Sequence, residues 1–273
     1  MVPGRWDQDS PFRGTRLSTG PPPGLATAAQ PWNSSPMRHA RPRRPLRDLA
    51  QDVLDLVHPR DCTGCGRAHT CWCADCAMAL RRGAFRHRPS PAPLGLPECF
   101  AASSYDGPVR SAIVAWKERG ERDMAEPFAE ALASAVAAAV GAGREPIVLV
   151  PVPTSQRSRR QRGDDILLGL AKRTARVLTQ AGIPTECRRM LRLVGTPRDQ
   201  STLNRDERLA NLTGAMALRR GWSIHRETPG RRLVVVDDVL TTGATLTEAS
   251  RALVEEGYVV TAAATVAATR RRG

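Results

Sequence analysis

Two hydrophobic patterns alternate along residues 98–268. The uninterrupted apolar runs Ile147–Val150 and Leu233–Val236 are typical of strands buried on both faces of a parallel sheet. A third strand is expected over Cys99–Tyr105, ending in a turn at Asp106-Gly107. Amphipathic or Ala-rich stretches predict helices over residues 109–117, 124–140, 165–180 and 246–256. This alternation predicts an α/β fold in which helices flank a parallel sheet.

Residues 1–45 have a different composition from this domain. They are rich in Pro and Arg and poor in apolar side chains, so we expect a disordered tail. Because Met37 lies just before the ordered part is expected to begin, we hypothesise that residues 1–36 reflect an upstream start choice. A native protein found by mass spectrometry to begin at Met1 would contradict that hypothesis.

The remaining segments are assigned by pattern and composition. Residues 46–80 are expected to form a short amphipathic helix, over 46–57, followed by a cysteine module. Residues 81–97 are again rich in Pro and Arg and are expected to be a linker. The main α/β domain is therefore expected over residues 98–273.

The most informative segment of that domain is Leu233–Leu246, an apolar run followed by two carboxylates and a Thr/Gly loop that opens a helix. Ligands of parallel sheets bind beyond the carboxyl ends of the strands, where we expect Asp237 and Asp238. Ionised carboxylates only accept hydrogen bonds, so the pair is suited to two adjacent sugar hydroxyls. The competing interpretation is an ordinary strand–turn–helix with solvated Asp side chains.

The loop after the acidic pair is suited to a phosphate. It offers free backbone N–H groups and three hydroxyls at the start of a helix, where the helix dipole also favours an anion. Its residues are Thr241, Thr242, Gly243, Ala244 and Thr245. The following helix is expected to end at Gly257 and to bury one face, formed by Leu246, Ala249, Leu253 and Val254. The sequence thus predicts a site for a phosphorylated sugar.

Two CxxC pairs near the N-terminus predict a metal site. Each CxxC turn directs two sulfurs to one point, and four thiolates close a tetrahedral zinc site with no open position, which implies a structural zinc. The four cysteines are Cys62, Cys65, Cys73 and Cys76. His69 and Cys71 lie between the pairs and can replace one ligand. A redox dithiol or a disulfide is the alternative, and disulfides are disfavoured because nothing else in the chain suggests export.

Composition limits the classes of function. No apolar run reaches the roughly 18 residues of a membrane helix, and the first residues lack a signal-peptide core, so we expect a cytoplasmic protein without a membrane span. The formal net charge of +14 is typical of proteins that bind polyanions. All but two of the 41 basic residues are Arg, a bias that a GC-rich genome also produces. The charge therefore has two competing explanations, a nucleic-acid-binding surface and genome composition.

A basic loop is expected to follow the Ile147–Val150 strand, at the same end of the sheet as the acidic pair. Its guanidinium groups can neutralise pyrophosphate, clamp the backbone of single-stranded DNA, or simply be solvated. We weigh these three interpretations equally. The Arg residues concerned are Arg157, Arg159, Arg160 and Arg162.

The stretch VVVDDVLTTGATL resembles the phosphoribosyl-pyrophosphate motif of type I phosphoribosyltransferases. The resemblance implies that Asp237 and Asp238 contact the ribose hydroxyls and are catalytic. It also implies that the loop at 241–245 holds the 5′-phosphate, and that Mg²⁺ accompanies phosphoribosyl pyrophosphate. The superfamily includes regulators that bind the ligand without turnover, so the motif predicts the ligand class and leaves catalysis open.

Further segments are similar to the ComF family of competence-associated proteins, which have an N-terminal zinc module and a phosphoribosyltransferase-like domain. The similarity covers residues 46–268 and rests on the double CxxC, YDGPVR leading to Trp116-Lys117, PVPTSQRSRRQRG and DQSTLNRDERLANLTGA. It implies that Lys117 binds ligand, that other competence proteins are partners, and that single-stranded DNA uptake is an alternative to enzymatic transfer. A surface charge is the competing interpretation of Lys117. The family usually continues RG with an aromatic residue and Asn, whereas Gly163 here precedes Asp164-Asp165.

Residues 199–215 permit two interpretations. Asn204-Arg205-Asp206-Glu207 has the spacing of a capping box, and Leu209 and Leu212 give the expected helix an apolar side. A surface helix fits this pattern, and so does a lid that excludes water from a reacting sugar. The surface helix is the simpler prediction.

Overall fold

The computed structural model describes residues 61–120, 122–143, 145–154, 165–194, 214–221 and 230–269. The expected tail, the helix expected over 46–57 and the basic loop with Arg157, Arg159, Arg160 and Arg162 lie outside the described residues. Most of the segment 199–215 lies outside them as well.

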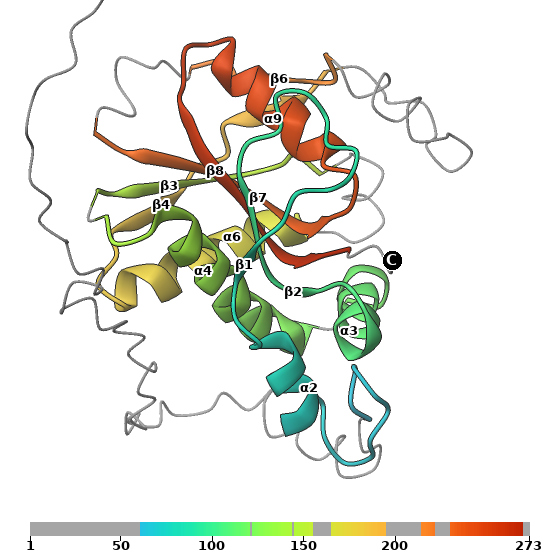
Figure 1. The fold of residues 1–273 in the computed structure, drawn as a ribbon. Coiled ribbons are helices and arrows are strands. Elements are labelled where there is room, and N and C mark those ends of the chain that lie inside the picture. The colour runs from blue at the N-terminus through green and yellow to red at the C-terminus, as the bar shows by residue number, and fades with distance from the viewer. Residues whose placement is uncertain are drawn as a thin grey trace, which may run out of the picture. The chain divides into compact units, whose positions relative to one another are not determined.

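A six-stranded sheet forms the centre of the domain, with the order β1-β2-β8-β7-β3-β4. All neighbouring strands are parallel except β1, which pairs antiparallel with β2 at one edge. In that order the strands are Phe85–Arg86, Cys99–Ser104, Val260–Ala268, Arg232–Leu240, Ile147–Pro151 and Thr185–Cys187. The predicted α/β fold with a mostly parallel sheet is confirmed. Figure 1 shows the strands running side by side through the molecule.

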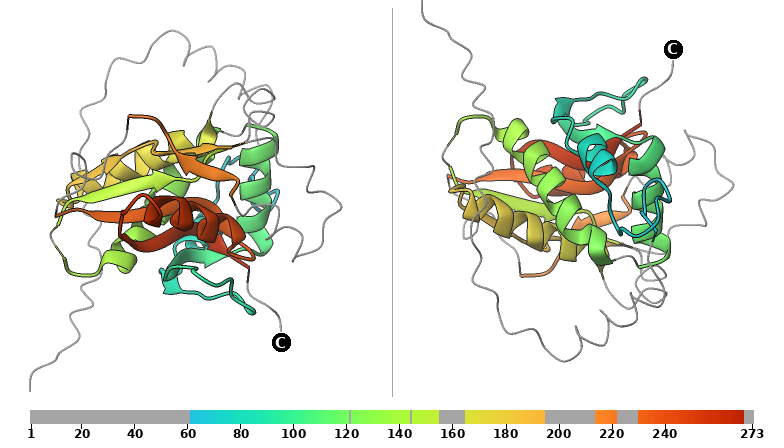
Figure 2. Two further views of the ribbon diagram at one scale, coloured as in Figure 1. Left: turned by 90° about the horizontal axis from the view of Figure 1, so that it is seen from above. Right: turned by 90° about the horizontal axis from the view of Figure 1, so that it is seen from below.

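Helices cover both faces of this sheet. Helix α9 (Ala244–Val254) lies on one face, and α4 (Ala125–Val140) and α6 (Ile166–Gln180) lie together on the other (Figures 1 and 2). Helix α3 (Gly107–Glu118) lies beside the carboxyl end of β2. The short α2 (Ala74–Leu80) contacts α3 and β2, and a 3₁₀ turn (Arg122–Met124) precedes α4.

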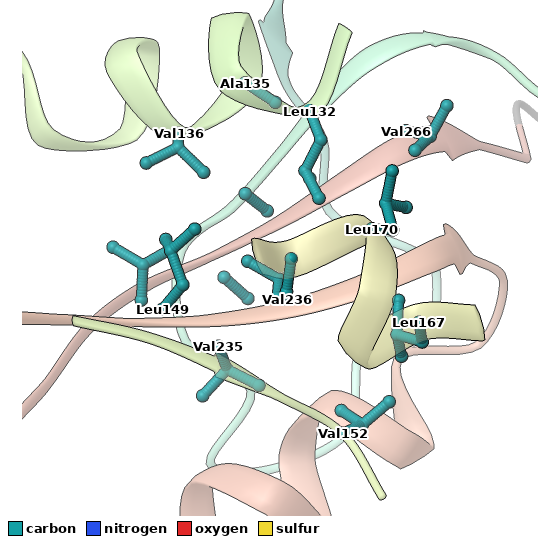
Figure 3. Packing of buried hydrophobic residues seen from close by; sticks show 14 of the residues in the cluster. Leu132, Ala135, Val136, Leu149, Val152, Leu167, Leu170, Val235, Val236 and Val266 are labelled. Carbon is teal, nitrogen blue, oxygen red and sulfur yellow. The ribbon is translucent and has the colours of Figure 1, made fainter. Parts of the chain in front are cut away.

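The core forms where these helices meet the sheet. Leu132 and Val136 of α4 and Leu170 of α6 pack against the sheet, and all three are almost completely buried (Figure 3). Val235 and Val236 of β7 point to opposite faces, as alternate residues of a strand must, and both are fully buried. The uninterrupted apolar run of β7 therefore reflects burial on both faces, as its sequence predicts.

Strand β7 is longer than its apolar run predicts. It continues through the two carboxylates to Leu240, because β8 remains paired with it up to Leu240↔Ala268. On its other side, the pairing with β3 ends at Pro151↔Val236. Asp237 and Asp238 therefore lie within a strand that has lost one of its two neighbours, and not beyond the strand's end.

Two smaller differences concern the segments next to this region. Phe85–Arg86 forms strand β1 inside the stretch expected to be a linker. Val254 was expected on the buried face of α9 but is 57% exposed, because the buried stripe runs through Leu246, Ala249 and Leu253 and position 254 is rotated away from it. Gly257, at φ 85°, follows the end of this helix as predicted.

A second, antiparallel sheet consists of β5 (Leu191–Leu193) and β6 (Met216–Leu218). Both of its strands contact α9. Among the described residues, no helix is both long enough and apolar enough to span a membrane.

Candidate functional site

Asp237 and Asp238 lie where β7 has lost its pairing with β3. That pairing ends at Val236, and among the described strands only β8 remains paired with β7 beyond it. Both residues are half-buried, and the Asp238 side chain is 13% exposed. The pair therefore combines restricted solvation with access from the carboxyl end of the sheet, where ligands of parallel sheets bind.

Lys117 comes from α3, far from the acidic pair in sequence, and forms an ion pair with it. Its Nζ lies 2.8 Å from Oδ1 of Asp238. Burial by itself would lower the pKa of Lys117, but the negative charge and hydrogen bond of Asp238 outweigh that effect and raise the pKa. The ammonium group is therefore charged at neutral pH and directed at the acidic pair. The structure brings together three of the residues that the sequence singled out.

Asp237 has a different environment from Asp238. Burial and the adjacent charge of Asp238 raise the pKa of Asp237 to about 8, although Lys117 and the Asp238 N–H act in the opposite direction. That N–H donates to Oδ1 of Asp237 at 2.8 Å. One ammonium group balances one carboxylate, so the second carboxylate of the pair retains its proton to higher pH.

The loop from Thr241 to Thr245 leads from β7 into α9. Gly243 is the N-cap of the helix at φ 83°, a left-handed conformation that side chains disfavour. Its carbonyl accepts hydrogen bonds from the N–H of Thr247 at 2.9 Å and from its Oγ1 at 3.0 Å. Ala244 N–H donates to Thr242 Oγ1 at 3.4 Å. Among the described residues, the N–H groups of Thr242, Gly243 and Thr245 have no acceptor, so they remain available to an anion at the helix N-terminus.

Asp165 occupies the position at which the ComF-like pattern has Asn. Its Oδ1 accepts hydrogen bonds from Thr154 Oγ1 at 3.0 Å and from Leu168 N–H at 3.3 Å, and its Oδ2 lies 3.4 Å from a guanidinium nitrogen of Arg189. Thr154 and Leu168 stand on either side of residues 155–164. The carboxylate thus caps α6 and joins the two ends of that segment, a role that the sequence indicates only through helix-cap chemistry.

Glu248 is a residue that sequence reasoning missed. It is 4% exposed on α9 and accepts hydrogen bonds from Met216 N–H at 2.8 Å and from the Arg251 guanidinium at 2.7 Å. Arg251 donates in turn to the Met216 carbonyl at 2.9 Å. These bonds attach β6 to the helix that carries the loop at 241–245. A Glu and an Arg at i,i+3 on a helix normally indicate a surface pair, so the sequence offers no signal of burial.

The four cysteines of the CxxC pairs form one cluster. Their Sγ atoms all lie within 4.8 Å of one another, with Cys62–Cys76 and Cys65–Cys73 each at 3.7 Å. A tetrahedral zinc with Zn–S bonds of about 2.3 Å separates its sulfurs by about 3.8 Å. The group does not include His69 or Cys71. The donor set and its spacing therefore fit a metal ion such as zinc.

The thiols of this cluster differ in their ionisation. Burial opposes ionisation of Cys62, but the backbone N–H groups of Cys73, Cys65 and Gly64 lower its pKa to about 6. For Cys76, burial and hydrogen bonds with the other cysteines raise the pKa. Four adjacent thiolates repel one another, so full deprotonation requires a bound cation.

Comparison with known proteins adds one finding. A family model described as "Phosphoribosyl transferase domain" matches residues 125–273, more than half of the chain. The match includes the acidic pair and the loop at 241–245, whereas Lys117 and the cysteine cluster precede it. No curated protein matches the chain.

Proposed function

The chain belongs to the phosphoribosyl transferase domain family, and from this premise we propose that it binds phosphoribosyl pyrophosphate or another ligand with a ribose 5-phosphate moiety. The observation that carries the proposal is the Lys117–Asp238 ion pair, in the same short segment as the left-handed Gly243 at the N-terminus of α9. Residues 237–245 thus provide both acceptors for hydroxyl groups and donors for a phosphate.

In this proposal each part of the site has one task. Asp237 and Asp238 accept hydrogen bonds from the two ribose hydroxyls. The N–H groups and hydroxyls of residues 241–245 hold the 5′-phosphate. Lys117 orients Asp238 through their ion pair, and its remaining N–H donors are available to the ligand.

We further propose that the protein transfers the phosphoribosyl group. A nucleophilic acceptor forms a bond to carbon 1 of the ribose, the bond to pyrophosphate breaks, and pyrophosphate leaves with the bonding electrons. Asp238 and, once it is ionised, Asp237 stabilise the positive charge that develops on the ribose in this step. Oxygen ligands of this kind suit Mg²⁺, which when bound neutralises the phosphate oxygens. Arg157, Arg159 and Arg160 are proposed to contact pyrophosphate.

Turnover can be tested without knowing the acceptor. The full chain is incubated with phosphoribosyl pyrophosphate, Mg²⁺ and a panel of nitrogen nucleophiles, and pyrophosphate release is followed. Release that depends on one acceptor and is lost in Asp237→Asn/Asp238→Asn supports transfer. Saturable binding of the ligand without release by any acceptor contradicts transfer and favours a protein that binds or senses the ligand.

The cysteine cluster favours a second candidate. We propose that it holds a structural zinc, as in the ComF family, and that the protein handles single-stranded DNA with other competence proteins in the cytoplasm. If Arg157, Arg159, Arg160 and Arg162 contact DNA phosphates, binding weakens steeply with salt. The plot of log binding constant against log salt concentration then falls with a slope of about 0.7 per phosphate contact on single strands. A salt slope that is unchanged after replacing these four residues excludes this role for the basic loop.

A further inference from the structure

The segment between β1 and β2, residues 87–98, lies against the loop that opens α9. Figure 1 shows it passing beside that helix. Both ends of the segment are fixed, because β1 and β2 pair antiparallel and His87 N–H donates to the Cys99 carbonyl at 2.9 Å. Residues 87–98 therefore contact the start of α9 while both of their ends are anchored in the main sheet.

Its closest approach is to Gly243. A Cβ placed on Gly243 would lie 3.0 and 3.1 Å from the two methyl groups of Leu96 and 3.4 Å from Cγ of Pro89. Leu96 is 7% exposed and belongs to the main hydrophobic core, and Pro89 is also buried. One side of the Gly243 backbone is thus covered by apolar atoms, which leave little room for a side chain there and restrict movement of the backbone toward that side.

The same segment also covers the first turn of the helix. A Cβ placed on Gly95 would lie 3.9 Å from Cγ2 of Thr247, whose N–H and hydroxyl both donate to the Gly243 carbonyl. Glycine loses more conformational entropy than any other residue when its backbone is fixed, so the left-handed conformation of Gly243 needs support from its surroundings. The packing of residues 87–98 provides that support.

We propose that Leu96, supported by Pro89, is a positioning residue that holds the loop at 241–245 in its anion-binding conformation. The identity of the anion, a ribose 5-phosphate group, rests on the proposed function. The ordering of the loop does not. Residues 87–98 precede the matched family region, so binding at a site within that region depends on chain outside it.

The chain provides a matched control two residues away. Leu94 belongs to the same segment but is 97% exposed, so Leu94→Ala removes the same atoms without opening a cavity. Leu96→Ala removes the contact with Gly243, and Leu96→Met restores much of the volume. If Leu96→Ala does not fold, the smaller truncation Leu96→Val replaces it.

The first measurement is amide hydrogen exchange on the ligand-free full chain. In Leu96→Ala the amides of Ala244 and Thr247, which donate to Thr242 Oγ1 and to the Gly243 carbonyl, should exchange at least about tenfold faster than in the wild type, while those of β4 are unchanged. Leu94→Ala should match the wild type, and Leu96→Met should recover most of the protection. Equal protection of Ala244 and Thr247 in Leu96→Ala and Leu94→Ala, or loss of protection throughout the chain, overturns the proposal.

The second measurement is binding of phosphoribosyl pyrophosphate with Mg²⁺, compared with pyrophosphate and Mg²⁺ alone. Leu96→Ala should weaken the binding of phosphoribosyl pyrophosphate by about fivefold or more and leave the binding of pyrophosphate unchanged. Only phosphoribosyl pyrophosphate places a 5′-phosphate in the loop. Equal weakening of both ligands contradicts a positioning role. If the wild type binds neither ligand, the proposed function fails, and the exchange measurement alone decides the role of Leu96.

Discussion

Asp237 is the residue whose ionisation differs most from that of an ordinary carboxylate in this site. Burial and the charge of Asp238 raise its pKa from 3.8 to about 8. A raised folded-state pKa stabilises the fold fully below the unfolded pKa, and this stabilisation is lost as the pH rises to the folded pKa. The ligand-free protein therefore loses stability between about pH 4 and pH 8, because over this range the unfolded chain releases the proton of this carboxyl and the folded chain retains it.

Asp237→Asn should remove that loss. The variant should match the wild type in free energy of unfolding near pH 4, exceed it increasingly up to about pH 8, and keep a constant advantage above that. Urea unfolding of both proteins across this pH range provides the measurement. A pH-independent difference between them would show that Asp237 has no raised pKa.

At the residue scale, the sequence identified the acidic pair and Lys117 as candidates because their types and local context are informative. It could not show that Lys117 Nζ lies 2.8 Å from Asp238, since the two residues are brought together only when α3 lies at the carboxyl end of the sheet. The perturbed ionisation of Asp237 depends on that same arrangement. The identity of these candidate residues was thus predictable from sequence, whereas their ion pair and the raised pKa of Asp237 were not.

At the scale of elements, the loop at 241–245 and helix α9 are held from two sides. Residues 87–98 cover Gly243, and Glu248 with Arg251 attaches β6 to the helix. Two predictions test whether these specific contacts stabilise the protein, each by comparison with a control residue that lacks them.

Gly243→Ala should destabilise the protein more than a substitution at a glycine with the same φ. Gly182 also has φ 83°, but a Cβ there meets no atom within 4 Å. Gly182→Ala should cost about 1–2 kcal/mol for the left-handed backbone alone. Gly243→Ala should cost about 1–3 kcal/mol more, because it also crowds Leu96. Equal losses of stability in the two variants, measured by thermal unfolding, would mean that the Leu96 side chain moves aside at no cost.

Glu248→Gln should weaken the attachment of β6. Burial opposes ionisation of Glu248, but hydrogen bonds from Arg251 and Met216 outweigh it and lower its pKa. The ionised group therefore stabilises the fold above pH 4.5, and this stabilisation is lost as the pH falls through the lowered pKa. At pH 7 the variant should lose about 1–3 kcal/mol.

Glu255→Gln is the matched control, since Glu255 also pairs with Arg251 but its side chain is 63% exposed. Its loss should stay below about 1 kcal/mol. Similar losses from both variants, compared by chemical unfolding at pH 7, would contradict a special role for the buried carboxylate.

The elements themselves were largely predictable from sequence. The helices over 107–118, 125–140 and 166–180 lie within two residues of the expected ones, because their apolar positions follow a helical period and Asp165 caps the last of them. The extension of β7 to Leu240 was not predictable, because it depends on pairing with β8 and not on local hydrophobicity. Strand β1 was missed for the same reason, in a segment whose composition is typical of a linker.

At the scale of the whole described domain, the cysteine cluster and the sheet are connected. Ser103 of β2 donates to the carbonyl of Ala79 in α2 at 2.9 Å, and α2 contacts α3, which carries Lys117. The spacing of the cysteines predicted their convergence because CxxC turns act locally. That the helix following them would pack beside α3 was not visible in the sequence, since it depends on tertiary contacts.

Removal of the proposed zinc should therefore destabilise not only the cysteine cluster but also the domain that α2 contacts. We expect one zinc per chain by elemental analysis, release on acidification as the thiolates become protonated, and a lower melting temperature after chelation. Cys65→Ser should reproduce the effect, whereas Cys71→Ser, outside the cluster, should retain zinc. A chain that contains no zinc and does not respond to chelator would contradict a structural metal site.

The central claim, that residues 237–245 hold a ribose 5-phosphate group, is tested most directly by calorimetric titration of the full chain with phosphoribosyl pyrophosphate and Mg²⁺. We predict saturable binding by the wild type and at least about tenfold weaker binding by Asp237→Asn/Asp238→Asn, because each lost hydroxyl contact costs about 1 kcal/mol or more. No binding by the wild type, or equal binding by both proteins, would contradict the account.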